Sequence, residues 1–191
     1  MLCLHSVLTD DNTWSHKTLL HFTKASNMTD RFNALSALVQ SGHALATEAL
    51  AIFYKMFANE ALVIDKWFAL QAGASDRGGH ILPIVRQLLQ HPDFSIKNPN
   101  RARSLIFSYC SANPGAFHRS DAAGYVFWSD RVLEMDAINP QVAARLARAL
   151  DRWSHLAEPY RSAAKVAIER VAAKPDLSND VREVVSRALS Q

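Results

Sequence analysis

The chain has 191 residues, of which 49% are hydrophobic and 20% are charged, an ordinary composition for a globular domain with one sizeable core. Its formal net charge is +3, and both signs of charge are interspersed along the chain. A nucleic-acid interface is therefore disfavoured, because such proteins concentrate Lys and Arg on one surface.

No segment approaches the roughly 20 apolar residues that a membrane-spanning helix needs, so no membrane partner is expected. The first residues lack the basic segment and long apolar run of a signal peptide. The two cysteines, Cys3 and Cys110, are too few for a disulfide framework, which favours a reducing compartment. We therefore expect a cytoplasmic protein.

Apolar residues recur at the 3.6-residue helical period along nearly the whole chain, and no run alternates as a strand would. In chain order, helices are expected over 11–24, 29–41, 43–58, 60–73, 80–91, 99–111, 121–137, 140–154, 158–173 and 178–190. The expected core stripes include Trp67 in 60–73 and Ala49, Phe53 and Met56 in 43–58.

The residues between these apolar stripes are typical helix start and stop signals. Asn98-Pro99, Asn113-Pro114 and Asn139-Pro140 each combine a good N-cap with proline at the first helical position, where the missing N–H costs nothing. Ser41-Gly42 and Gly78-Gly79 are typical helix stops.

The segment 98–105 resembles the segment 139–146, 41 residues further along, which is near the period of HEAT and armadillo repeats. We therefore expect an all-α, HEAT/armadillo-like superhelical stack of about nine or ten helices and no sheet. The concave face of such a stack is a natural lining for a cavity.

The residues alone indicate no catalytic chemistry. No two of the eight histidines lie four apart, so no His-Glu-x-x-His zinc motif is present, and neither cysteine belongs to a Cys-x-x-Cys pair. Gly78-Gly79 lacks the following Lys-Ser/Thr of a phosphate-binding loop. We expect no metal or cofactor in this chain.

Several short motifs, in order and spacing, resemble the C-terminal domain of bacterial aminopeptidase N, a zinc metallo-aminopeptidase family. They are Asn27-Met28-Thr29-Asp30, Asp65-Lys66-Trp67-Phe68, Asn98-Pro99-Asn100-Arg101-Ala102-Arg103, Asp121-Ala122-Ala123-Gly124-Tyr125 and Asn139-Pro140-Gln141-Val142-Ala143. The match covers 19–191, whereas 1–18 matches more loosely and resembles the remnant of a preceding helical region.

The resemblance implies a domain that packs over a zinc-containing catalytic domain and closes the chamber in which N-terminal residues are removed from peptides. Its partners would be that catalytic domain of the same enzyme and the peptide substrate. The zinc ligands and the general base of the family have no counterpart in this sequence, so we expect the chain to be inactive alone.

The resemblance also implies that Arg103, Gln141 and Arg145 contact the substrate beyond the scissile bond. Gln141 and Arg145 are four apart and would share one helix face. The alternative interpretation is a solvated arginine stripe, and it is retained for Arg148 and Arg152.

A different class of function is an independent helical-repeat scaffold whose concave face recruits another protein. The genomic context separates the two hypotheses. A reading frame that continues upstream into a His-Glu-x-x-His segment supports the peptidase domain, and an independent start favours the scaffold.

Overall fold

The computed structural model describes residues 12–190, and all the secondary structure in that range is helical. The helices are α2 (Asn12–Lys24), α3 (Met28–Ser41), α4 (Leu45–Phe57), α5 (Ala61–Ala72), α6 (Ile81–Leu88), α7 (Pro99–Ala102), α8 (Ser108–Cys110), α9 (Pro114–Phe117), α10 (Ala123–Asp136), α11 (Pro140–Ala147), α12 (Tyr160–Ala172) and α13 (Asn179–Leu189). A π turn, η1 (Arg103–Phe107), joins α7 to α8, and two short 3₁₀ turns, η2 (Arg148–Leu150) and η3 (Trp153–His155), follow α11. The prediction of an all-helical repeat stack is confirmed.

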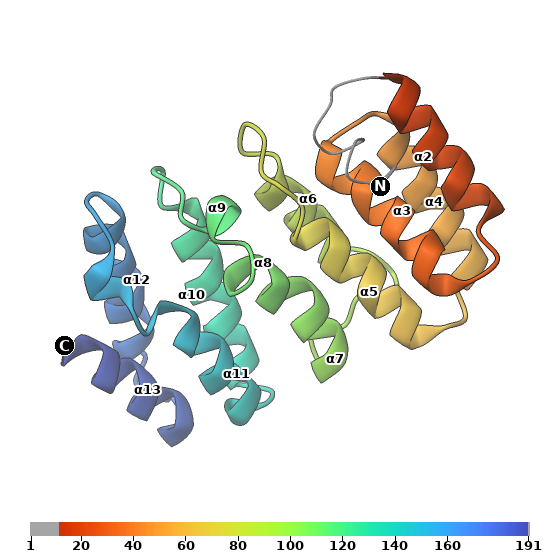
Figure 1. Ribbon diagram of the computed structural model, residues 1–191. Helices are drawn as coiled ribbons and strands as arrows, with labels where there is room; N and C mark the ends of the chain where they lie inside the picture. The colour runs from red at the N-terminus through yellow and green to blue at the C-terminus, as the bar shows by residue number, and fades with distance from the viewer. Residues whose placement is uncertain (1–11, 191) are drawn as a thin grey trace.

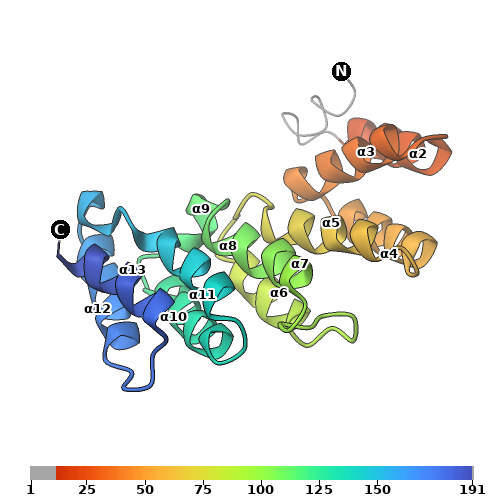
Figure 2. The ribbon, with the colours of Figure 1, turned by 90° about the horizontal axis from the view of Figure 1, so that it is seen from below.

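The helices pack as successive antiparallel pairs in two layers (Figure 1). Helices α5, α7–α8, α11 and α13 form one layer, and α6, α10 and α12 form the other, as the view from below shows (Figure 2). The α2–α3 pair lies beyond α4 at one end and rises on the side of the first layer (Figure 2). None of the helices in residues 12–190 is long and apolar enough to cross a membrane.

Contacts between successive repeats recur at a sequence separation near 40 residues. The side-chain amide of Asn113 donates to the carbonyl oxygens of Ala72 and Ala74, at 2.9 and 2.8 Å. The amide N–H of Ser178 donates to the carboxylate of Asp136 at 3.0 Å, 42 residues away. The echo between segments 98–105 and 139–146 therefore reflects one structural unit that the chain repeats.

The predicted caps are confirmed at all three Asn-Pro pairs, since the side chains of Asn98, Asn113 and Asn139 each accept a backbone N–H of the helix that follows. Gly42 ends α3 in the left-handed region with φ of 67°, as the stop signal predicts. The expected division between 1–18 and 19–191 falls within α2 and stays a prediction.

Three details of the sequence prediction were wrong. Met56 was assigned to the core, but its side chain is 49% exposed at the last turn of α4. The expected helix 99–111 contains the π turn η1, and the expected helix 140–154 ends at Ala147 and continues as 3₁₀ turns. Helical periodicity does not distinguish these tighter and wider turns, because each shifts the side chains by only a fraction of a turn.

Candidate substrate-contacting site

The first candidate residue, Arg103, lies where α7 passes into the π turn η1. Asn98 opens this helix by accepting the backbone N–H groups of Asn100 and Arg101, at 3.0 and 3.3 Å. The exposed side chain of Arg103 makes a long hydrogen bond of 3.4 Å from its Nη1 to Oδ1 of Asn100. Its guanidinium group is therefore available to a ligand from outside.

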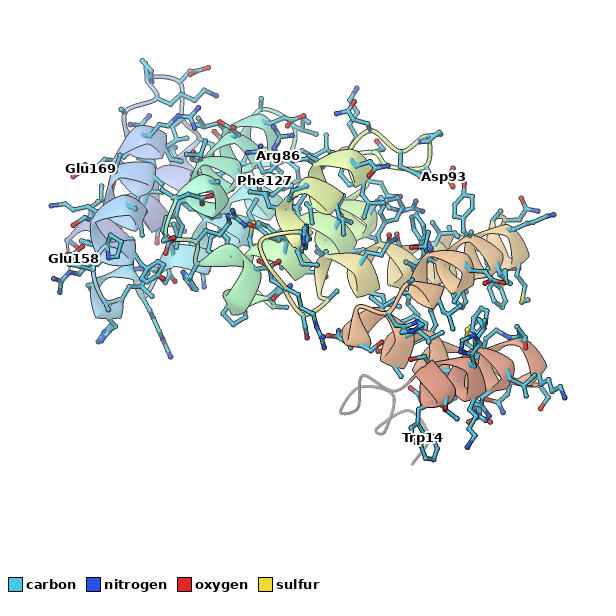
Figure 3. The ribbon with its side chains drawn as sticks, turned by 90° about the horizontal axis from the view of Figure 1, so that it is seen from above. Trp14, Arg86, Asp93, Phe127, Glu158 and Glu169 are labelled. Atoms are coloured by element: carbon cyan, nitrogen blue, oxygen red, sulfur yellow. The ribbon has the colours of Figure 1, made fainter. Side chains whose placement is uncertain are left out.

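Arg101, two positions earlier, has a structural role. Its Nε lies 2.6 Å from the Asp65 carboxylate on α5, and both side chains are almost fully buried. Its Nη1 donates to the carbonyl oxygen of Asp93 at 2.6 Å, and its guanidinium carbon lies 4.9 Å from the centre of the Phe68 ring. Asp93 belongs to the loop between α6 and α7 (Figure 3). Arg101 thus joins α5, this loop and α7.

Gln141 and Arg145, the other two candidates, line the same surface hollow. Asn139 caps α11 by accepting the backbone N–H of Val142 at 3.1 Å, and in this helix Val142 is buried while Gln141 and Arg145 are exposed. The hollow measures about 300 Å³ and is lined by Gln141, Ala144, Arg145, Arg148, Asp180, Glu183 and Val184. We call it the α11–α13 hollow.

Of the three predicted residues, the structure therefore places two at one site. Arg103 is not among the residues that line the α11–α13 hollow, because it begins η1, which follows α7 in an earlier unit of the chain. The sequence interpretation missed Asp180 and Glu183, which complete the opposite wall of the hollow. Their position after the N-cap Ser178 was a signal only for a helix start.

A larger depression of about 560 Å³ lies between α4 and α6 and was not predicted. Its floor is Trp67, whose Nε1 donates to the carbonyl oxygen of Leu50 at 3.1 Å and whose side chain is 7% exposed. The core assignment of Trp67 is therefore confirmed. His91 lies against the same ring, with 5.4 Å between the ring centroids.

Three of the perturbed titratable groups are buried or half-buried side chains: Cys110, His118 and Tyr125. Burial raises the pKa of Tyr125 to about 12, and burial also raises the pKa of the Cys110 thiol. Burial lowers the pKa of His118, whose Nδ1 lies 2.9 Å from the Tyr125 hydroxyl. Each of these shifts arises from desolvation, which is the ordinary result of packing such groups inside a protein.

A zinc site needs several His, Cys, Asp or Glu ligands around one point. Among the side chains of residues 12–190, no group of three or more of these residues could hold a metal ion. The resemblance implies a zinc ion in a separate catalytic domain, and the described residues offer no group of ligands that would hold one here. Cys3 and His5 lie outside the described residues.

The fold and the hollow define the chain as a helical-repeat domain with a polar groove between two of its units. It belongs to the family described as "Domain of unknown function (DUF3458_C) ARM repeats", which matches residues 1–190.

Two protein sequences and one solved structure are similar to this chain. The chain is 38% identical over 188 residues to aminopeptidase N of Caulobacter vibrioides, covering 98% of this chain and 22% of that protein. It is 37% identical over 169 residues to aminopeptidase N of Escherichia coli, covering 88% and 19%. The crystal structure of Legionella pneumophila aminopeptidase A in complex with aspartic acid superposes with a TM-score of 0.87 at 28% identity, covering 93% of this chain and 21% of that one.

These matches confirm the resemblance to the C-terminal domain of aminopeptidase N. The chain spans about a fifth of the length of the curated relatives that it matches.

Proposed function

We propose that this chain is a non-catalytic domain of a cytoplasmic, zinc-dependent aminopeptidase N, where it closes the substrate chamber and holds the part of the peptide beyond the scissile bond. The observation that carries the proposal is the α11–α13 hollow, where Gln141 and Arg145 stand exposed on one helix face. The zinc ion and its ligands belong to the catalytic domain, and this chain contributes a wall and polar contacts.

The chemistry of these side chains suits a peptide ligand. A planar guanidinium group donates two parallel hydrogen bonds to a carboxylate, and it binds carbonyl oxygens as well. The carboxamide of Gln141 both donates and accepts, so it can bind a peptide N–H or C=O. Arg103 adds a third polar contact from the preceding unit, which is consistent with an extended ligand.

Substrates with and without residues beyond the scissile bond test this proposal in the complete enzyme. We expect Arg145→Ala to raise KM for a tripeptide such as Ala-Ala-Ala about tenfold, the low end for a lost charged hydrogen bond. Hydrolysis of an alanyl chromogenic amide, which has no residue there, should change less than twofold. Arg103→Ala should behave in the same way.

Arg152→Ala is the matched control, because Arg152 is exposed and lies outside the α11–α13 hollow. It should leave both substrates unaffected. Equal losses on both substrates in the Arg145 and Arg103 variants, or no loss on the tripeptide, would contradict the proposed role.

A further inference from the structure

The two walls of the α11–α13 hollow carry opposite charges. Arg145 and Arg148 come from α11 and the start of η2, whereas Asp180 and Glu183 come from the first turns of α13. Two arginines and two carboxylates therefore line one hollow of about 300 Å³. The hollow as a whole is therefore neutral, but it is strongly polarised from one wall to the other.

None of these four side chains makes an ion pair or hydrogen bond within residues 12–190, although α11 and α13 are packed neighbours. One turn further along, the same two segments do close an ion pair, with Arg187 Nη2 at 3.6 Å from the Asp151 carboxylate. The four charged side chains that line the hollow are therefore unpaired among the described residues, whereas the oppositely charged residues one turn beyond it form an ion pair.

The walls are held apart by the core beneath them. Val142 and Leu146 on α11 and Val181 and Val184 on α13 are buried and pack in one cluster. Because these contacts fix the spacing of the two helices, the charged walls keep their separation without a ligand. The helix backbones on which the charged side chains stand are therefore fixed before a ligand binds.

We propose that the α11–α13 hollow binds the C-terminal residue of a short peptide whose side chain is cationic, that is, Lys or Arg. The arginine wall, with Gln141, takes the terminal carboxylate, and the acidic wall of Asp180 and Glu183 takes the ammonium or guanidinium group. The inference rests on the proposed function and adds a substrate class to it. The α11–α13 hollow, at about 300 Å³, is at the low end of the roughly 300–1,000 Å³ range of small-molecule sites. Such a volume suits a single residue.

Charge complementarity gives the expected selectivity. A C-terminal Lys satisfies both walls, whereas a C-terminal Glu brings a second carboxylate toward Asp180 and Glu183 and is disfavoured by like-charge repulsion. Exposed ion pairs contribute only about 0.2–1 kcal/mol each. We therefore expect the two carboxylates together to favour a C-terminal Lys over a C-terminal Glu by about threefold to tenfold in kcat/KM.

The test compares kcat/KM for Ala-Ala-Lys, Ala-Ala-Glu and Ala-Ala-norleucine in the complete enzyme. We expect the wild-type order to be Lys, then norleucine, then Glu, with the differences shrinking at high salt as exposed charges are screened. The double variant Asp180→Asn/Glu183→Gln should bring the Lys-to-Glu ratio close to one, and Glu183→Lys should invert it.

Glu169→Gln is the control for the loss of a surface carboxylate, because Glu169 lies on α12, away from the hollow (Figure 3). This variant should keep the wild-type Lys-to-Glu ratio of kcat/KM. A wild-type ratio near one, or a ratio that survives the double substitution, overturns this inference. If Arg145→Ala also leaves tripeptide hydrolysis intact, the proposed function fails as well. If that variant is impaired, only the charge selectivity fails.

Discussion

Two arginines that stand two positions apart on one helix have opposite environments. Arg101 is buried against Asp65, 36 residues earlier in the chain, while Arg103 faces solvent. Helical geometry explains the difference, since residues two apart point to nearly opposite sides. The motif Asn98–Arg103 alone does not predict which arginine is buried, because the burial of Arg101 depends on the Asp65 carboxylate of another helix. The resemblance alone singled out Arg103.

A pH-dependent stability should arise from His118. Burial lowers its pKa in the folded state, so the unfolded chain, with an ordinary pKa of about 6.5, binds a proton first as the pH falls. The contribution of His118 to stability is therefore complete above about pH 6.5 and is lost as the pH drops toward its lower folded pKa.

We expect the free energy of unfolding, measured by urea denaturation, to decrease between pH 7 and pH 5.5. In His118→Gln, which can keep a hydrogen bond to the Tyr125 hydroxyl, this decrease should be smaller. Equal slopes in the two proteins would exclude His118 as the source.

Single helices were predictable because their caps are local. An Asn side chain and the proline after it specify a helix start within four residues, and the structure confirms all three such starts. What local signals could not give were the π turn at Arg103–Phe107 and the early end of α9 at Phe117. These depend on packing between elements, for example on the bonds from Asn113 to the end of α5.

The junction of α9 and α10 gives a sharp test of such packing. A Cβ atom on Gly124 would lie 2.0 Å from the carbonyl oxygen of Phe117, so no side chain fits there without moving the backbone. We expect Gly124→Ala to lower the free energy of unfolding by about 3 kcal/mol, as overpacking against an immobile group does.

Gly115→Ala in α9 is the matched control, because a Cβ at Gly115 would meet no atom within 4 Å. Its unfolding free energy should stay the same or rise by about 0.5–1 kcal/mol, the helix preference of alanine over glycine. Chemical denaturation of both variants measures the difference. A Gly124→Ala protein as stable as the wild type would mean that α10 is not held this close to α9.

At the scale of the whole molecule, the repeat of about 40 residues links the sequence to the architecture. The echo between the two Asn-Pro segments predicted stacked units, and contacts such as Asn113–Ala72 and Ser178–Asp136 show how each unit bonds to the next. The α11–α13 hollow was beyond prediction from sequence, since it exists only where two units meet. The resemblance singled out Gln141 and Arg145, which line this hollow, but gave no signal for Asp180 and Glu183, and a substrate-contacting role stays a prediction for all of them.

The central claim is that peptide hydrolysis by the complete enzyme depends on this domain. A complementation experiment measures this dependence directly. The remaining portion of the proposed parent aminopeptidase is purified without this chain, and hydrolysis of Ala-Ala-Ala is assayed before and after this chain is added. We predict that neither part alone cleaves the tripeptide efficiently and that mixing restores cleavage in a saturable manner. Full tripeptide activity of the remaining portion by itself, unchanged by the added chain, would contradict the claim that this domain holds the substrate.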